Sequence, residues 1–302
     1  DPDFSELTGS GKDKRSFSIT ENTIVRLILK KKTYKVEWSI EGNDTALPSG
    51  MDTIIQAKVN ATAVPAGSTE TNVELNGSIE LEVTRLENGR IIKGWEVDGN
   101  LKTTNETGIT IENDKKKLTL NNVRQAHTVK LVLEPKKYPV TVYIAKPEAV
   151  AHGYALKTTK NGDEITGTMG EGTIAGDTKY SYSDVEHGAQ MVFKATTGGS
   201  VYEVDRWEYD EGGTWKDVST SSQYTPNTPP NPDILKWNVN GAIKLRVLLR
   251  KKTYKVEWKI GGHGNNNTTS INVKADGVNV ASSGSYVEIG KTIVFTATQV
   301  EG

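Results

Sequence analysis

The chain has 302 residues, no cysteine, and a formal net charge of −1 from 37 basic and 38 acidic residues. The absence of cysteine excludes disulfides and thiolate metal sites, and the balanced charge excludes the basic footprint of a general nucleic-acid binder. No apolar run approaches the roughly 18 residues of a membrane helix, so the sequence predicts no membrane span.

The first predicted strand is the apolar run IVRLILK at 24–30, and similar runs occur at 128–134 and 244–250. Each run has one fully apolar face and a partly apolar second face, which favours a central position in a sheet or a contact between repeats over a sheet edge. In all three cases a tyrosine follows ten residues after the first residue of the run. We interpret these runs as the closing strands of a repeat.

The next predicted strand carries the clearest repeat of the chain. KKTYKVEWSI at 31–40 returns as KKTYKVEWKI at 251–260, and a looser copy, KKYPVTVYI, occupies 136–144. Apolar residues alternate with polar ones in each copy, and this period of two predicts a strand with one buried face. Pro139 cannot donate a backbone hydrogen bond, so we expect it at a sheet edge or among the first residues of its strand.

A second landmark follows each opening strand. The pattern V-E-x-(N/G) occurs at 73–76, 185–188 and 287–290. Its last residue is of a type that tolerates a left-handed backbone, which predicts a turn into the next strand. In the two complete copies a tryptophan, Trp95 or Trp207, lies 22 residues after the valine of this pattern. We therefore expect these two indoles to occupy equivalent buried positions.

The repeat is long enough to be a domain. Its opening tyrosines are separated by 104 and then 116 residues, and the longer copy contains a glycine-rich stretch at 166–181. The fold class predicted is all-β, mainly antiparallel, with β-grasp-like or Ig-like sandwich domains in an elongated rod. The predicted units are 1–32 (closing part of a repeat), 33–135 (complete repeat), 136–252 (complete repeat with an insert) and 253–302 (opening part of a repeat).

The two outer units each carry only part of a repeat, so we expect the sequence to be an excerpt from a longer polypeptide. Apolar strands at both ends would be exposed in isolation, notably Val25, Leu27 and Leu29 at one end and Tyr254, Val256, Trp258 and Phe295 at the other. We expect them to be covered by the rest of the polypeptide or by a neighbouring copy of the chain that docks head to tail.

The order of these motifs resembles a known family. Tyr-x-Val, V-E-x-G before a strand ending in Ala-Thr, Trp-x-x-Asp-Gly, and a closing strand that leads into the next repeat are similar to the divergent internalin-B-type B-repeat of bacterial surface proteins. The resemblance implies a β-grasp-like or related β-rich module in an exported stalk or adhesin. It implies no catalytic residues.

The residues themselves also give no pattern for catalysis or for a cofactor. The histidines His127, His152, His187 and His263 are far apart and lack metal-ligand spacing. Acidic residues alternate with lysines on strand faces that are predicted to be solvent-exposed. They give no support for the paired carboxylates of a glycosidase site. We expect no catalytic residue, no metal site and no cofactor.

Aromatic residues of the second complete repeat are the candidates for a ligand surface. They are Trp215 and Tyr224, which belong to the insert of the longer repeat, and Trp237. Exposed flat rings can stack on sugars or peptides, whereas buried rings anchor long loops to a core. Exposure of Trp215 and Tyr224 side by side would indicate binding, and burial would indicate a spacer.

The sequence therefore predicts a non-enzymatic extracellular protein that forms a stalk, filament or surface-layer-type assembly on a prokaryotic cell. Its expected partners are other copies or neighbouring repeats, arranged head to tail. The alternative is an adhesin or carbohydrate-binding module that contacts cell-surface carbohydrate or a host protein through the aromatic residues of the second complete repeat. No nucleic-acid partner is expected.

Overall fold

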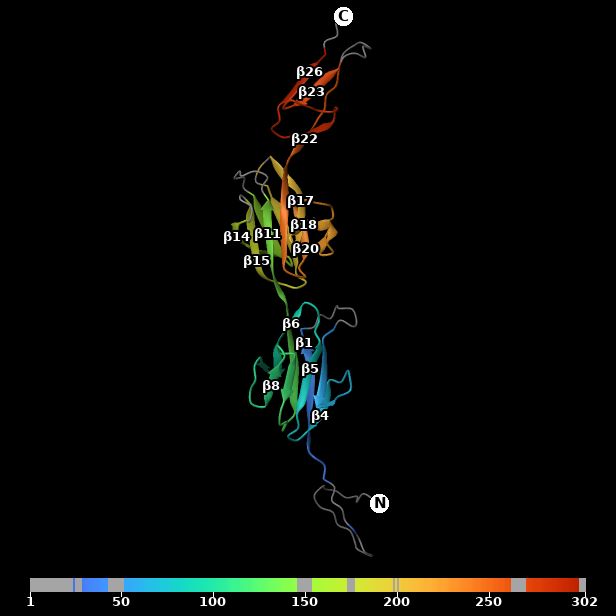
Figure 1. Ribbon diagram of the computed structural model, residues 1–302, viewed down its shortest axis with the longest axis vertical. Coiled ribbons are helices and arrows are strands. Elements are labelled where there is room, and N and C mark those ends of the chain that lie inside the picture. Colours follow the sequence, from blue (N-terminus) through green and yellow to red (C-terminus); the bar gives the residue numbers. More distant parts are fainter. Residues whose placement is uncertain are drawn as a thin grey trace. The chain divides into compact units, whose positions relative to one another are not determined.

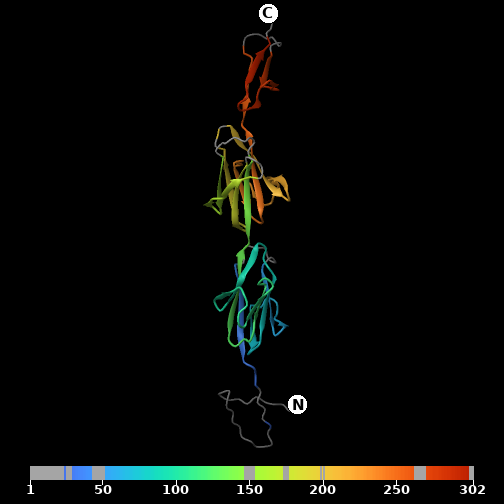
Figure 2. The ribbon, with the colours of Figure 1, turned by 60° about the vertical axis from the view of Figure 1, so that its left-hand side comes forward.

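The computed structural model describes residues 24, 29–42, 52–145, 154–172, 177–197, 199, 201–261 and 270–298 (Figures 1 and 2). These residues form β-strands and turns, together with one short 3-10 helix, η1 (Val218–Thr220). No helix in this part of the chain is long and apolar enough to cross a membrane. The prediction of an all-β fold is confirmed.

The first copy of the repeat, residues 33–135, forms two five-stranded sheets. The strand orders are β4-β1-β10-β6-β7 and β3-β2-β5-β9-β8. The strands are β1 (Thr33–Glu41), β2 (Ile54–Val59), β3 (Thr62–Ala63), β4 (Glu70–Glu74), β5 (Ile79–Arg85), β6 (Arg90–Val97), β7 (Asn100–Lys102), β8 (Ile109–Glu112), β9 (Lys117–Leu120) and β10 (His127–Pro135).

The second copy, residues 136–252, also forms two sheets, ordered β14-β15-β11-β21-β17-β18 and β13-β12-β16-β20-β19. The strands are β11 (Lys137–Ala145), β12 (Ala155–Lys160), β13 (Asp163–Ile165), β14 (Thr168–Glu171), β15 (Thr178–Glu186), β16 (Gln190–Thr196), β17 (Tyr202–Glu211), β18 (Thr214–Asp217), β19 (Tyr224–Thr225), β20 (Ile234–Asn238) and β21 (Ile243–Lys251).

The third copy, residues 253–302, contributes a two-stranded sheet, β22-β25, and a three-stranded sheet, β24-β23-β26. Its strands are β22 (Thr253–Val256), β23 (Ile271–Ala275), β24 (Val278–Asn279), β25 (Ser285–Glu288) and β26 (Ile293–Ala297). In the described part of the chain, strands pair only with strands of the same copy.

The closing strands are central, as predicted. β10 lies between β1 and β6, and β21 lies between β11 and β17. β21 pairs in parallel with β11, from Val140 opposite Ile243 to Ala145 opposite Leu248. A parallel pair needs a long crossover connection, which the intervening strands of the copy supply. Antiparallel pairs predominate elsewhere, in agreement with the prediction.

The core of the second copy lies between its two sheets. Val142 on β11 and Leu245 on β21 belong to the same buried cluster as Phe193 on β16 and Trp237 on β20. Two sheets that share one apolar core form a sandwich, which is the Ig-like alternative of the predicted fold class. The β-grasp alternative implied by the resemblance is not observed, because the described residues include no α-helix to cover a sheet.

The two equivalent tryptophans are buried as predicted. Trp95 on β6 is 0% exposed and Trp207 on β17 is 4% exposed. The indole Nε1 of Trp207 donates to the backbone carbonyl of Pro232 at 2.8 Å. A buried indole generally requires such a polar partner.

The V-E-x-(N/G) turns also adopt the predicted conformation. Their last residues, Asn76, Gly188 and Gly290, have φ of 66°, 80° and 86°. In each copy the opening tyrosine lies opposite the valine of the turn: Tyr34 with Val73, Tyr138 with Val185, and Tyr254 with Val287.

The third copy exposes apolar side chains that are buried in the complete copies. Phe295 is 52% exposed, whereas its equivalent in the second copy, Phe193, is 0% exposed. Tyr254 is 53% exposed, while Val256 and Trp258 are half-buried. At the other end Leu29 is 81% exposed, and Val25 and Leu27 lie outside the described residues. What covers these strands stays a prediction.

A hairpin turn after the second strand of each copy gives a testable stability effect. Asn161 has φ of 51°, and its Oδ1 accepts from the backbone N–H of Gln190 at 2.9 Å. Asn161→Ala should destabilise the second copy by about 1–2 kcal/mol, because it removes the acceptor and strains a left-handed residue. Asn161→Asp keeps the acceptor, as Asp276 does toward Thr292 in the third copy, and should cost less. Equal losses in urea unfolding would contradict this explanation.

Candidate functional site

The structure does not bring the three predicted ligand-binding aromatics together. Trp237 on β20 is 0% exposed, and its ring centroid lies 5.5 Å from that of Tyr209 in the core. Tyr224 on β19 is half-buried and pairs with Trp237, whereas Trp215 on β18 belongs to the other sheet. Trp237 therefore has no surface for a ligand, which corrects that part of the prediction. The period-two pattern could have shown that Trp237 points inward between Leu235 and Val239.

Trp215 packs within a cluster of side chains on its own sheet. The guanidinium carbon of Arg246 lies 4.4 Å from the centroid of its ring, and Tyr143 approaches it edge-on at 6.2 Å between centroids. Arg246 Nε also donates to Glu208 Oε2 at 2.6 Å, and Arg206 Nε donates to Glu208 Oε1 at 2.9 Å. Since Glu208 is only 7% exposed, the cluster shields a charge-paired carboxylate. This arrangement gives Trp215 a structural role.

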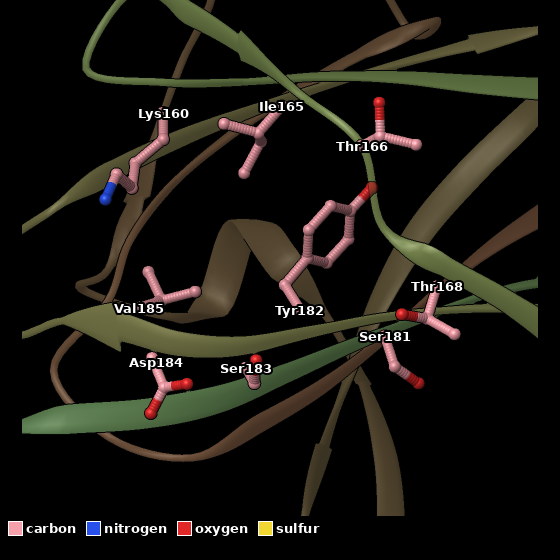
Figure 3. Close-up of a pocket in the computed structure, with 9 residues that line it drawn as sticks. All are labelled: Lys160, Ile165, Thr166, Thr168, Ser181, Tyr182, Ser183, Asp184 and Val185. Carbon is pink, nitrogen blue, oxygen red and sulfur yellow. The ribbon is translucent and has the colours of Figure 1, made fainter.

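The second copy also contains a cavity. A cavity of about 240 Å³ opens beside β12, β13, β14 and β15 (Figure 3). We call it the β15 pocket. It is lined by Lys160, Ile165, Thr166, Thr168, Ser181, Tyr182, Ser183, Asp184 and Val185. Most of these side chains carry a hydroxyl or a charge, so the wall is polar.

One wall of the β15 pocket is a β-bulge. Tyr138 lies opposite Val185, but Val140 lies opposite Tyr182, so Ser183 and Asp184 together face Pro139. Asp184 has φ of 58°, a left-handed conformation that aspartate tolerates better than most residues. Pro139 is the third residue of β11 and precedes the pairing with β21, as expected for a residue that cannot donate to the ladder. The bulge places Ser183 and Asp184 in succession on the exposed side of β15, whereas the side chains of Tyr182 and Val185 are buried.

The opposite wall approaches the ring of Tyr182 closely. A Cβ added at Gly167, between β13 and β14, would lie 2.7 Å from the ring carbon Cζ of Tyr182, so only glycine fits there. The hydroxyl of Tyr182 is hydrogen-bonded to the buried Oγ1 of Thr158. Burial raises the pKa of the Tyr182 hydroxyl, which keeps it neutral. Figure 3 shows this ring among the lining side chains.

Sequence reasoning missed the β15 pocket. The available signal was the length difference between the copies, because the glycine-rich stretch at 166–181 contributes β14 and part of β15. β14 has no counterpart in the sheets of the first copy among the residues that the structure describes. The prediction from the sequence assigned importance to the later, aromatic insert instead.

No group of metal-ligating side chains is present in the described ranges. His127 pairs with Asp98, with 2.7 Å between Nδ1 and Oδ2, and His187 packs at 6.0 Å against the ring of Tyr138. His152 and His263 lie outside the described residues. The absence of catalysis and cofactors stays a prediction.

No family model and no curated protein matches the chain, so the resemblance to internalin-B-type repeats is not confirmed. Among solved structures, the chain is similar to a C-terminal fragment of the pilus adhesin SpaC from Lactobacillus rhamnosus GG, with 12% identity and a TM-score of 0.34 over 73% of this chain and 98% of that chain. It covers only 31% of a longer SpaC chain.

The chain is also similar to the Bacillus anthracis TIE protein, at 12% identity and a TM-score of 0.36 over 89% of this chain and 43% of that chain. For the major pilin from Streptococcus pyogenes, the identity is 8% and the TM-score 0.29, over 72% of this chain and 97% of that chain. Likenesses at this level carry no conclusion about activity or partners.

Proposed function

We propose that the chain is a non-enzymatic structural part of an extracellular stalk or filament on a prokaryotic cell. The observation that carries this proposal is the recurrence of one β arrangement in three copies with almost no linker between them. One residue, Lys136, separates β10 from β11, and one residue, Lys252, separates β21 from β22. Such connections are far too short to behave as flexible coils, so successive domains act as spacers in series.

Solution scattering tests the spacer role. A compact globule of 302 residues would have a radius of gyration of about 19 Å, whereas beads in series should give about 30 Å or more. Antibody labelling of intact producing cells should detect the chain without permeabilisation. A radius near the compact value, or labelling only after permeabilisation, would contradict the proposal.

Assembly head to tail would follow from the exposed strands. The run at 24–30 has the pattern of β10 and β21, the strands that lie beside β1 and β11. In a neighbouring copy it would pair in parallel with β22 and cover Trp258 and Phe295. The contact is heterologous and does not have to close, so it would extend a filament.

Sedimentation of the 302-residue chain tests this assembly. We expect association that increases with concentration and that Leu27→Lys weakens, because a charge would enter the apolar contact. Lys14→Glu, outside the run, is the matched control and should leave association unchanged. A monomer at every concentration would contradict head-to-tail docking.

The adhesin alternative has support from the β15 pocket rather than from the aromatics predicted from the sequence. β14, which lines the pocket, has no counterpart in the described sheets of the first copy, as expected for a feature added to a repeated scaffold.

A further inference from the structure

The third copy has a sheet edge that the closing part of a repeat would not cover. In the complete copies the closing strands lie beside β1 and β11, on the side away from β4 and β15. The run at 24–30 would add to β22 on that same side. The opposite edge of the sheet, β25, pairs with β22 alone in the described part of the chain. This edge is therefore separate from the head-to-tail contact.

Apolar side chains on the flank formed by β24 and β25 replace polar ones. By strand pairing, Tyr286 on β25 occupies the position of Asn72 on β4, and Val278 on β24 occupies that of Thr62 on β3. Tyr286 is 69% exposed and Val278 is 71% exposed. A hollow of about 280 Å³ lies on this flank and is lined in part by Val278 and Val280. Gathered on one flank, these features are typical of an interaction site.

The equivalent edge of the second copy is protected against pairing with another chain. β14 pairs with β15 over residues 178–181, and the bulge at Ser183 and Asp184 interrupts the rest of the edge. β25, in contrast, pairs with β22 in unbroken register from Ser285 to Glu288. Covering strands and bulges discourage the addition of a further strand, and β25 has neither in the described ranges.

The backbone of β25 determines how a further strand could pair with it. The N–H of Ile289 donates to the carbonyl of Lys252 at 2.9 Å, so every second residue from Ile289 directs its backbone groups toward β22. Tyr286 belongs to the other set, and its N–H and C=O point away from β22. Antiparallel addition of a β25 strand from a second molecule can therefore place Tyr286 opposite Tyr286 in a hydrogen-bonded pair.

The charges on β25 permit this pairing with a second molecule. With Tyr286 opposite Tyr286, Glu288 lies opposite Gly284 of the other molecule, an uncharged residue. The same arrangement of two β4 strands about their middle residue would place Glu70 opposite Glu74. Like charges that are directly opposite destabilise a sheet. The edge of the third copy is thus compatible with its own image, whereas that of the first copy is not.

We propose that two molecules of this chain associate side by side through antiparallel pairing of β25 with β25. The contact is isologous, because the same flank of each molecule faces the other. Tyr286 contacts its equivalent on the outer face of the joined sheet, and Val278 meets the same flank of the partner molecule. This association goes beyond the spacer role and does not depend on it, since it links two chains laterally and does not extend a filament.

Sedimentation of the Leu27→Lys chain, in which head-to-tail docking is weakened, tests the lateral contact. We expect a reversible dimer, which Tyr286→Asn should weaken about tenfold or more, because it installs the residue of the first copy. Val294→Glu is the matched control and should leave the dimer unchanged. Val294 is 51% exposed on β26 of the same copy, outside the flank, and counting from the V-E-x-(N/G) turns makes Glu80 its equivalent in the first copy.

Two results would overturn the proposal. One is a Leu27→Lys chain that is monomeric at every concentration, which would include the case of an edge that accepts only a strand from another protein. The other is a dimer that Tyr286→Asn leaves unchanged. The thermal transition of each variant checks that the chain is folded.

Disulfide trapping tests the register independently, because the chain contains no cysteine of its own. The Cα atoms of a hydrogen-bonded antiparallel pair lie about 5.5 Å apart, which a disulfide can span. Tyr286→Cys should therefore give a cross-linked dimer under mild oxidation, and Asn72→Cys at the equivalent position of β4 should not. Equal cross-linking of the two variants would indicate random collision and would also overturn the proposal. None of these results bears on head-to-tail docking, which is tested by the effect of Leu27→Lys itself.

Discussion

Trp207→Ala is expected to lower the free energy of unfolding of the second copy by about 3–5 kcal/mol. Its indole is 4% exposed, packs against the ring of Phe193 with 6.4 Å between centroids, and donates to the carbonyl of Pro232. Truncation leaves a large cavity and an unpaired carbonyl, and a packed core relaxes only partly around such a gap.

Calorimetry can follow this effect, because the two complete copies should unfold in separate transitions. Trp95→Ala should lower the transition of the first copy, and Trp207→Ala that of the second. Trp215→Ala is the matched control within the second copy and should cost about 1 kcal/mol, since Trp215 is half-buried and contacts mainly Arg246. Equal losses for Trp207→Ala and Trp215→Ala would show that Trp207 does not anchor the core.

Arg246→Met should destabilise the second copy by about 2–3 kcal/mol. Removing one partner of a buried ion pair typically costs about 3–5 kcal/mol, because the remaining charge is left uncompensated. Glu208 is 7% exposed and would retain only Arg206, whose own side chain is 50% exposed. The retained partner explains why the expected loss is below the usual range.

An exposed ion pair of the same sheet provides the control. Arg250 pairs with Glu203 at 2.9 Å, but the two side chains are 60% and 38% exposed. Arg250→Met should therefore cost about 1 kcal/mol or less. Adding Glu208→Gln to Arg246→Met should recover part of the loss, because it removes the uncompensated charge. If the double variant is no more stable than Arg246→Met alone, the lost stability comes from packing against Trp215 and not from the uncompensated charge of Glu208.

Features of the fold that depend on local chemistry could be predicted from the sequence. Alternation with period two identified the strands that contain Tyr34 and Tyr138, and the choice of Asn or Gly identified the left-handed turns at Asn76 and Gly188. Equal spacing from these turns was sufficient to predict that Trp95 and Trp207 are buried. Each inference needs only neighbouring residues and an internal repeat, so no knowledge of distant contacts is required.

The surroundings of Trp215 and the position of the pocket depend on contacts between distant strands. Trp215 covers the Arg246–Glu208 ion pair, which the sequence does not reveal, whereas the alternation of Leu235, Trp237 and Val239 already indicated that Trp237 points inward. The β15 pocket forms where the backbone at Gly167 lies against the ring of Tyr182. The bulge at Ser183 and Asp184 lies opposite Pro139 beside it. These contacts join strands whose register depends on the whole sandwich. They therefore cannot be predicted from the alternation of residues along one strand.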